Sequence, residues 1–353
     1  MFYKPFEAWV KRVTIDDVAE RAGVSKSTVS AVINDSRPVS EETRKKVDDA
    51  VAELNYRPRA SARRPMQTGR SIGLIIKERS NPFFADIADG VADAIRDAGY
   101  TLYVASSEGS YATENEIIGD LTDRDVDGLI IYPVMNEETD LTNLLELRRA
   151  RVPFVLMERI AGVKANVVDI STASASKKAV EYLLNSGHQR IVHFAGPLYS
   201  QHSDARIDGM RYAFSETQIA FSDDLIVRAG AQMRDGYQAA LDYFGDCPAD
   251  DRPTAATCFN DQVALGAYRA LQELGLDVPG DVSLIGCDGI DVLNYMPVRL
   301  TTIQSPSREM GATAASILRN HIEADEQPDL EQKRFEPELL IRESTRSIQS
   351  ASS

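Results

Sequence analysis

Basic and hydroxyl side chains gather near the start of this 353-residue chain, and both kinds of side chain bind phosphate groups. The stretch from Tyr56 to Arg70 holds five arginines and no acidic residue. Residues 1–70 carry a net charge of +4, whereas residues 71–353 carry −19. An acidic protein does not bind nucleic acid through its bulk, so the pattern indicates a basic, DNA-binding head attached to a body with another role.

Two helices within residues 14–34, TIDDVAERAGVSKSTVSAVIN, would position the basic and hydroxyl side chains of that stretch. Thr14 is a favourable N-cap for a first helix, Gly23 can adopt the left-handed conformation that ends it, and Ser25 can cap a second helix. That pattern predicts a helix-turn-helix, whose second helix fits a DNA major groove, with an ordinary helical hairpin as the alternative. A third helix is expected over residues 41–56. In the second helix we expect Val29, Val32 and Ile33 to face inward and Lys26, Ser27, Ser30 and Ala31 to face outward.

From Ile72 onward, short apolar runs alternate with amphipathic helical stretches. Such alternation predicts parallel, doubly wound sheets, and nine or more strands favour two α/β subdomains over one sheet. Helices are expected at 82–99, 175–187, 206–216, 236–244 and 262–275. Strands are expected at 72–76, 101–106, 128–134, 154–157, 166–170, 190–196, 225–230, 255–260 and 282–288.

Composition and motifs narrow the class of protein. No apolar run approaches the roughly 18 residues of a membrane helix and no export signal is visible, so we expect a cytoplasmic, nucleoid-associated protein. The three cysteines lack metal-ligand spacing and are expected to be buried thiols. No Gly-x-Gly-x-x-Gly follows the first strand, and no Walker loop, metal signature or nucleophile elbow is present. We therefore expect no cofactor and no metal; a sugar- or nucleotide-modifying enzyme stays as the rival class.

Several segments carry a specific resemblance. VTIDDVAERAGVSKSTVSAVIN, VSEETRKKVDDAVAELNYRP and SIGLIIKERSNPFFADIADGV are similar to the lac repressor family, as are NSGHQRIVHFAGP, SDARIDGM and CFNDQVALGAYRALQELGLDVPGDVSLIGCD. The resemblance runs from about residue 13 to 341. It implies a homodimeric transcriptional regulator, not an enzyme, with a helix-turn-helix head, a hinge helix and an effector-binding core like the type I periplasmic binding proteins.

The resemblance also implies domain boundaries. The head would span residues 13–56 and the hinge 57–70. The first core subdomain would comprise residues 71–168 with 302–328, and the second 169–300 with 329–346. The chain would cross between them near 168–171, 300–304 and 327–331.

By the same resemblance, Lys26, Ser27 and Ala31 would read bases, although Ala31 offers only apolar contact with a thymine methyl. Ser25, Thr28 and Ser30 suit phosphates, and Thr28 could instead pack inside its helix. The remaining expected DNA-binding residues are Thr14, Asn34, Arg59, Arg63, Arg64 and Met66.

The hinge departs from the family pattern. Relatives carry a leucine near its end that wedges into the minor groove. Counting from Tyr56 puts Pro65 at that position, so either the hinge helix stops early or Met66 supplies the wedge.

The effector would bind between the subdomains. The resemblance places Asn81, Phe83 and Phe84 at the cleft end of the first strand, and Arg206 matches the family arginine that grips hydroxyls or a carboxylate. Asn260 and Asp261 begin a helix, where Asp261 could simply cap it, and Asp288 ends a strand. This set of groups suits a polyhydroxylated ligand, so a sugar or sugar derivative is expected.

Four aromatic residues could stack on a sugar, although core packing is the alternative for each: Phe83, Tyr132, Tyr199 and Phe259. His202 is a weak further candidate for the site, and a surface histidine is the commoner alternative. The tail after Ile341 has one large apolar residue, Ile348, which cannot form the coiled coil of tetrameric relatives, so a dimer is expected.

Overall fold

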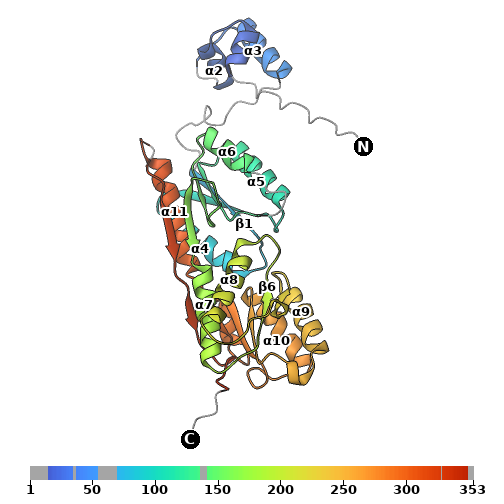
Figure 1. Ribbon diagram of the computed structural model, residues 1–353. Helices are drawn as coiled ribbons and strands as arrows, with labels where there is room; N and C mark the ends of the chain where they lie inside the picture. Colours follow the sequence, from blue (N-terminus) through green and yellow to red (C-terminus); the bar gives the residue numbers. More distant parts are fainter. Residues whose placement is uncertain (1–14, 35–36, 55–69, 136–140, 327, 349–353) are drawn as a thin grey trace. The chain divides into compact units, whose positions relative to one another are not determined.

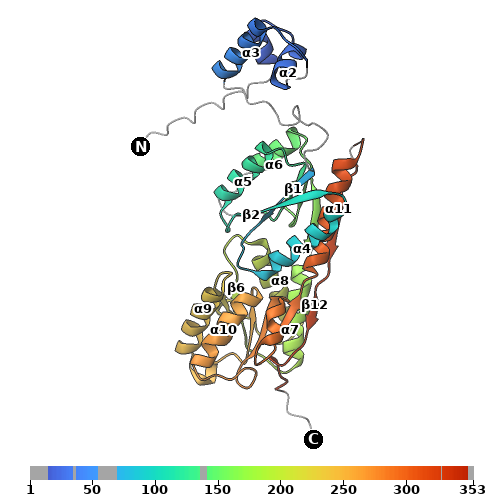
Figure 2. The same ribbon diagram turned by 180° about the vertical axis from the view of Figure 1, so that it is seen from behind.

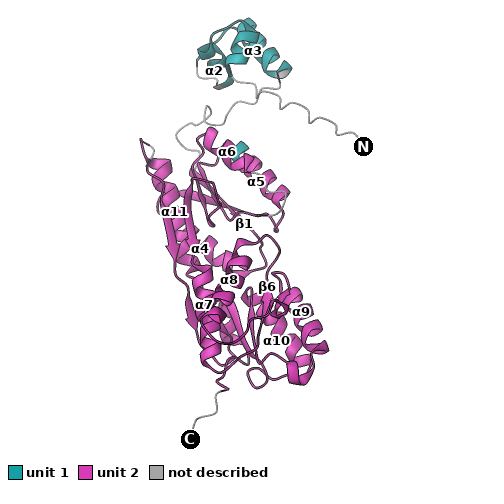
Figure 3. Ribbon diagram, in the orientation of Figure 1, with its two compact units in different colours: residues 1–69, 122–125 teal, residues 70–121, 126–353 magenta. Residues whose placement is uncertain are grey.

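The computed structural model of the chain describes residues 15–34, 37–54, 70–135, 141–326 and 328–348 (Figure 1). Two compact units are distinguished in Figure 3: residues 1–69 with 122–125, and residues 70–121 with 126–353. Within the described residues, no helix is long and apolar enough to cross a membrane.

The head contains three helices: α1 (Ile15–Ala22), α2 (Lys26–Asn34) and α3 (Glu41–Glu53). Gly23 has a φ of 65°, which confirms the left-handed turn that was expected after the first helix. The Ser25 hydroxyl accepts a hydrogen bond from the Thr28 amide at 3.2 Å, so it caps α2 as predicted. Buried residues from all three helices form one small core: Val18, Ala19, Val29, Val32, Val47 and Ala50.

The body consists of two six-stranded sheets, as the alternation of strands and helices predicted. The first has the order β11-β5-β4-β3-β1-β2 and the second β12-β10-β9-β8-β6-β7. The strands that were expected are β1 (Arg70–Ile76), β2 (Tyr100–Ser106), β3 (Gly128–Ile131), β4 (Phe154–Leu156), β5 (Asn166–Ile170), β6 (Ile191–Ala195), β7 (Ile226–Arg228), β8 (Ala255–Cys258) and β9 (Ser283–Asp288). Three further strands were not expected: β10 (Thr301–Gln304), β11 (Gln332–Phe335) and β12 (Glu338–Leu340). Strand pairs are parallel except β10 with β12.

Helices cover both faces of each sheet, which gives two doubly wound lobes (Figures 1 and 2). In the first lobe, α4 (Pro82–Arg96) and α11 (Ser307–Glu323) share one apolar cluster, and α5 (Tyr111–Asp123) and α6 (Thr142–Arg149) share another. In the second lobe, α9 (Met233–Asp246) and α10 (Asp261–Glu273) pack on one face, and α7 (Thr172–Asn185) and α8 (Gln201–Ser215) on the other. Three short 3-10 helices complete the lobe: η2 (Asp223–Leu225), η3 (Ala249–Asp251) and η4 (Asp291–Tyr295).

The chain passes between the lobes three times. The first crossing lies between Ile170 and Thr172, inside the expected range. The other two expected positions were too early: β10 pairs with β9 in the second sheet, and β11 pairs with β5 in the first. Residues 302–304 therefore belong to the second lobe and residues 329–335 to the first. The error arises because TTIQ and QKRF are short and polar, so they resemble connecting segments.

Candidate functional site

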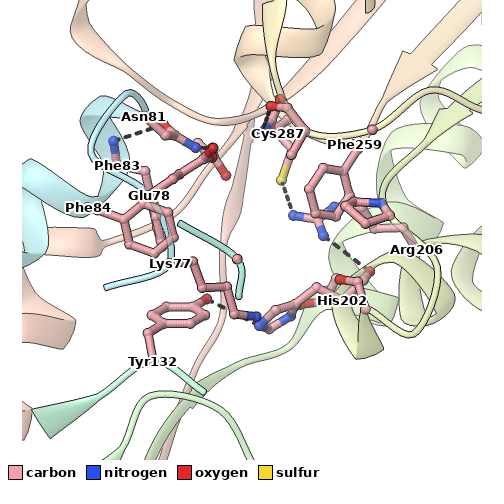
Figure 4. A pocket seen from close by; sticks show the side chains of 18 of the residues that line it. Lys77, Glu78, Asn81, Phe83, Phe84, Tyr132, His202, Arg206, Phe259 and Cys287 are labelled. Atoms are coloured by element: carbon pink, nitrogen blue, oxygen red, sulfur yellow. Dashed lines mark hydrogen bonds between the residues drawn. The ribbon is translucent and has the colours of Figure 1, made fainter. Parts of the chain in front are cut away.

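A cavity of about 420 Å³ lies between the two lobes, at the carboxyl ends of their strands (Figure 4). Parallel sheets bring the loops after β1, β3, β6, β8 and β9 to this place. Both lobes line the cavity, and the sequence-predicted residues among them are Asn81, Phe83, Phe84, Tyr132, Arg206, Phe259, Asn260 and Asp288.

Two asparagines are fixed by the helices that they cap. The Asn81 side-chain oxygen accepts from the Phe83 amide at 3.1 Å at the start of α4, which leaves its Nδ2 to donate to Asp288 Oδ2 at 3.0 Å. Asn260 caps α10 in the same way and donates to the Ala231 carbonyl at 2.8 Å. The helix caps thus orient one polar side chain from each lobe at the cavity.

Arg206 is 9% exposed, and no carboxylate among the described residues is in hydrogen-bonding contact with it. Its guanidinium donates to the His202 carbonyl at 3.1 Å and to Cys287 Sγ at 3.0 Å, and it lies 4.8 Å from the centre of the Phe259 ring. Its Nε is buried without a hydrogen-bond partner in the described part of the chain. A buried guanidinium with spare donor capacity favours binding of a ligand oxygen.

Asp288 is an acidic group that the second lobe brings to the cavity. Burial and the neighbouring Asp261 carboxylate raise the pKa of Asp288 to about 8, against the opposing effects of Arg206 and Asn81. The raised pKa favours the protonated form, in which the side chain can donate as well as accept hydrogen bonds.

A charged network on the cavity wall was missed by the sequence analysis. Lys77 Nζ lies 2.9 Å from Glu158 Oε2, and both residues line the cavity. Burial tends to raise the pKa of Glu158, but attraction to Lys77 and His202 outweighs it and holds that pKa below its ordinary value. Both residues follow strands closely, so the rule that ligands bind at strand ends could have found them.

His202, the weak candidate of the sequence analysis, lines the cavity and is not a surface histidine. Its side chain is 12% exposed, because α8 begins at the cavity and His202 lies on the face of the first turn that lines it. His202 Nδ1 lies 2.9 Å from Thr172 Oγ1, and its Nε2 lies 3.2 Å from the Tyr132 hydroxyl, across the cleft. Burial lowers the pKa of His202, although Glu158 opposes this.

The aromatic candidates divide into two groups. Phe83, Phe84 and Tyr132 meet edge to face, with ring centres 5.2–6.2 Å apart. Phe259 lies across the cavity against Arg206 (Figure 4). Tyr199 is not among the lining residues and is 47% exposed, so neither stacking on a ligand in this cavity nor core packing describes it; its φ is 63°.

Asp261 was also misplaced. It is fully buried behind the cavity and does not line it. As the first residue of α10 it faces the sheet, where its carboxylate accepts hydrogen bonds from neighbouring backbone. Cys258 and Cys287 are buried free thiols as expected, whereas Cys247 is partly exposed.

On the head, the exposed start of α2 offers hydrogen-bonding groups. Lys26 and Ser27 are exposed as expected, and Ser25 Oγ lies within 2.9 Å of the hydroxyls of Ser27 and Thr28. Lys26 Nζ contacts Asp16 at 3.0 Å. Ala31 is only 2% exposed, so its outward placement was wrong: a methyl group reaches little beyond the helix backbone. Outside the described residues or side chains lie Thr14, Asn34, Arg59, Arg63, Arg64, Pro65 and Met66.

Comparison with known proteins assigns the chain to a protein family. The family of bacterial regulatory proteins called lacI matches residues 14–59, and the periplasmic binding protein-like domain matches residues 180–345. The transcriptional repressor PurR of Vibrio vulnificus is 36% identical over 338 residues, which is 95% of this chain and 99% of that protein. The chain belongs to the lacI family. PurR of Aliivibrio fischeri is 35% identical, over 94% of this chain and 98% of that protein.

Solved structures agree with this lacI-family assignment. The lac repressor dimer bound to operator and the anti-inducer ONPF has a TM-score of 0.68 at 29% identity, over 95% of this chain and 100% of that one. The CelR–cellobiose complex has a TM-score of 0.69 at 29% identity, over 94% and 100%. A regulator from Enterococcus faecium with bound ribose has a TM-score of 0.70 at 28% identity, over 79% and 100%.

These findings confirm the family, the two-part fold class and the DNA-binding regulatory role that the resemblance implied. They also decide against the rival enzyme class, because the relatives and structural neighbours are transcriptional regulators.

Proposed function

We propose that this lacI-family protein is a repressor that acts in the cytoplasm as a homodimer, and that a sugar or sugar derivative between the lobes of its core sets its affinity for operator DNA. The observation that carries the proposal is the cavity itself, which takes hydrogen-bonding groups from both lobes. A ligand that contacts both lobes binds one relative orientation of them better, and it shifts the population toward that orientation by its differential affinity.

A sugar suits the chemistry of the cavity wall. The expected effector contacts are the polar groups Asn81, Arg206, Asn260 and Asp288 and the aromatic rings Phe83, Phe84 and Tyr132; we add Lys77, Glu158 and His202. The rings of the first lobe pack edge to face against one another, and Arg206 covers the Phe259 ring. A ligand therefore meets more polar groups than aromatic faces that are free for stacking. This arrangement favours a ligand with many hydroxyls, and the ribose and cellobiose complexes of structural neighbours support it.

A purine is the second candidate, because the repressors that match almost the full chain are named PurR. A thermal-shift screen of the purified chain against sugars, sugar phosphates and purines separates the two. A ligand at about 100 times its Kd stabilises the folded state by about 2.7 kcal/mol. Stabilisation by purines alone would overturn the sugar proposal and keep the regulator.

Arg206 is the residue on which the effector response is proposed to depend. Arg206→Met retains most of the side-chain volume but removes the guanidinium, so it should abolish the response while operator affinity without effector stays within about threefold. Loss of both operator binding and effector response would mean that Arg206 holds the fold, and the site assignment would then be wrong.

For the head, we propose that Lys26 and Ser27 read base edges and that Ser25, Thr28 and Ser30 bind phosphates, with Thr14, Asn34, Arg59, Arg63, Arg64 and Met66 completing the contact. Binding should weaken steeply with salt, because phosphate contacts release counterions. Lys26→Ala should change base preference, whereas Arg63→Ala should weaken all sequences alike. Affinity for the best operator that is flat between low and moderate salt would contradict this.

A further inference from the structure

The carboxylate of Asp261 is wholly engaged behind the cavity. Its Oδ2 accepts hydrogen bonds from the amides of Gly289 at 2.6 Å and Ile290 at 2.9 Å, and its Oδ1 accepts from the Thr302 hydroxyl at 2.6 Å. The side chain has no exposed surface. Asp261 therefore joins the start of α10 to the end of β9 and to β10, and it offers no free face to a ligand.

The turn that Asp261 binds has an unusual backbone. Asp288 has a φ of 121° and Gly289 a φ of 82°, and a residue with a side chain rarely adopts the first of these values. The successive amides of Gly289 and Ile290 both point to the same carboxylate oxygen, so this turn forms a small anion-binding concavity. Here the anion is the chain's own Asp261 carboxylate, which compensates the strain at Asp288.

Close packing leaves this turn little alternative space. A Cβ atom on Gly286 would lie 2.1 Å from Asp261 Oδ1, and one on Gly289 would lie 2.9 Å from the Gln304 Cα. The Asp288 carbonyl accepts from the Ser305 amide at 3.0 Å. With its backbone held on both sides, Asp288 directs its carboxyl group to Asn81 in the opposite lobe.

We propose that Asp261 is the positioning residue of the effector site: it holds the turn 288–290 so that Asp288 faces the cavity and Asn81, and it does not touch the effector. That Asp288 binds an effector rests on the proposed function. That Asp261 sets the conformation of Asp288 does not, and it can be tested on the protein without any ligand.

Two substitutions of Asp261 distinguish a positioning role, which needs its hydrogen bonds, from a role that needs only its negative charge. Asp261→Ala removes all three hydrogen bonds. Asp261→Asn is isosteric: its oxygen can accept from both amides while its amino group donates to the Thr302 hydroxyl. Asp291→Ala, an exposed acid just after the turn, is the matched control.

The first measurement is hydrogen–deuterium exchange of the full chain on peptides that span residues 284–293. In Asp261→Ala, the amides of Gly289 and Ile290 should exchange roughly tenfold faster or more, because they lose their acceptor. Asp261→Asn and Asp291→Ala should stay close to wild type. The second measurement is the side-chain amide signal of Asn81 in protein labelled with ¹⁵N-asparagine, which should move in Asp261→Ala only.

Unchanged exchange and an unchanged Asn81 signal in Asp261→Ala would overturn the proposal. So would Asp261→Asn being as disruptive as Asp261→Ala, because charge rather than hydrogen bonding would then be required. If Asp261→Ala does not fold, Thr302→Val provides the test. It removes one of the three hydrogen bonds of Asp261 and should accelerate exchange at Gly289 and Ile290 to an intermediate degree. Unchanged exchange in Thr302→Val would overturn the positioning role of Asp261. If no sugar stabilises the protein in the effector screen but the exchange results are as expected, the proposed ligand class is refuted and the positioning role of Asp261 is retained.

Discussion

Asn81 and Asp288 lie on opposite lobes, and a single hydrogen bond of 3.0 Å from Asn81 Nδ2 to Asp288 Oδ2 joins them across the cavity. The amide oxygen of the same asparagine caps α4. One residue thus links the fold of the first lobe to the relative position of the second, and its two roles can be separated by substitution.

Asn81→Ser should retain the cap, since serine also accepts from the helix amide, and remove the donor to Asp288. A neutral hydrogen bond contributes about 1 kcal/mol net, so the ratio of closed to open lobes should fall roughly fivefold. Small-angle X-ray scattering would show this as a larger radius of gyration. Asn294→Ser, which alters an exposed asparagine of η4, should leave the radius unchanged; an equal increase there would mean that the contact with Asp288 is not responsible.

The contact between Lys26 and Asp16 on the head gives a second prediction. Both side chains are more than half exposed, so the pair contributes at most about 1 kcal/mol to head stability. Asp16→Asn frees Lys26 and removes a negative charge beside the proposed DNA face. Affinity for an operator duplex should rise roughly fivefold, which corresponds to about 1 kcal/mol.

Fluorescence anisotropy at two salt concentrations measures this gain, which should shrink at the higher salt. Asp48→Asn on α3 makes the same change in net charge at an exposed residue outside α1 and α2. If Asp48→Asn raised affinity as much, the effect would be one of overall charge, and the local argument about Lys26 would be refuted.

The sequence was informative where a local rule determines the structure. Gly23, Ser25 and Ser40 end or begin helices in the head by conformations and side-chain bonds that depend on neighbouring residues only. The long apolar strands and amphipathic helices of the core were likewise predictable from periodicity. Short strands such as β11, QKRF, were not, because pairing with β5 stabilises them rather than their own composition.

Site residues were less predictable, because the direction of a side chain at an element's end depends on tertiary packing. Asp261 and His202 both lie in the first turn of a helix near the cleft. The sequence placed Asp261 in the site and gave His202 only as a weak candidate, whereas packing turns Asp261 into the sheet and His202 into the cavity. Lys77 and Glu158 follow strands by one and two residues, and only the assembled lobe shows that they meet.

His193 predicts acid sensitivity of the core. It is buried on β6, bonded to Thr257 Oγ1 at 2.9 Å, and burial, with a smaller effect of Arg206, lowers its pKa from 6.5 to about 3. Below pH 6.5, His193 is protonated in the unfolded chain but stays neutral in the folded chain. The free energy of unfolding therefore falls by about 1.4 kcal/mol per pH unit as the pH drops toward 3.

His193→Asn keeps a polar atom near Thr257 and cannot titrate. Urea unfolding at pH 7, 6 and 5 should show the wild type losing stability relative to this variant as the pH falls. Taking the difference between the two proteins matters, because the raised pKa values of Asp288 and Glu114 act in the opposite direction. A difference that is constant across this range would mean that His193 takes up its proton in the folded state.

The pair of Lys77 and Glu158 carries the last prediction. Glu158 is 3% exposed at its side chain, and one of its oxygens has no hydrogen-bond partner within the described residues. The other oxygen lies 2.9 Å from Lys77 Nζ and 3.5 Å from His202 Nε2, so Lys77 is the nearer of two partners. Lys77→Met should cost about 3–5 kcal/mol of stability, because a buried charge loses its partner. Without Lys77, burial should raise the pKa of Glu158 above its ordinary value of 4.5, and the free energy of unfolding should then fall as pH rises past that value.

Adding Glu158→Gln to Lys77→Met removes the stranded charge and should restore most of the loss. Urea unfolding of the wild type, both single variants and the double variant, at pH 5 and pH 7.5, gives the coupling energy between the two residues. A coupling near zero, or a Lys77→Met protein whose stability does not decline between the two pH values, would show that Glu158 is solvated or paired elsewhere, and that the first lobe does not hold a dry ion pair at this wall of the cavity.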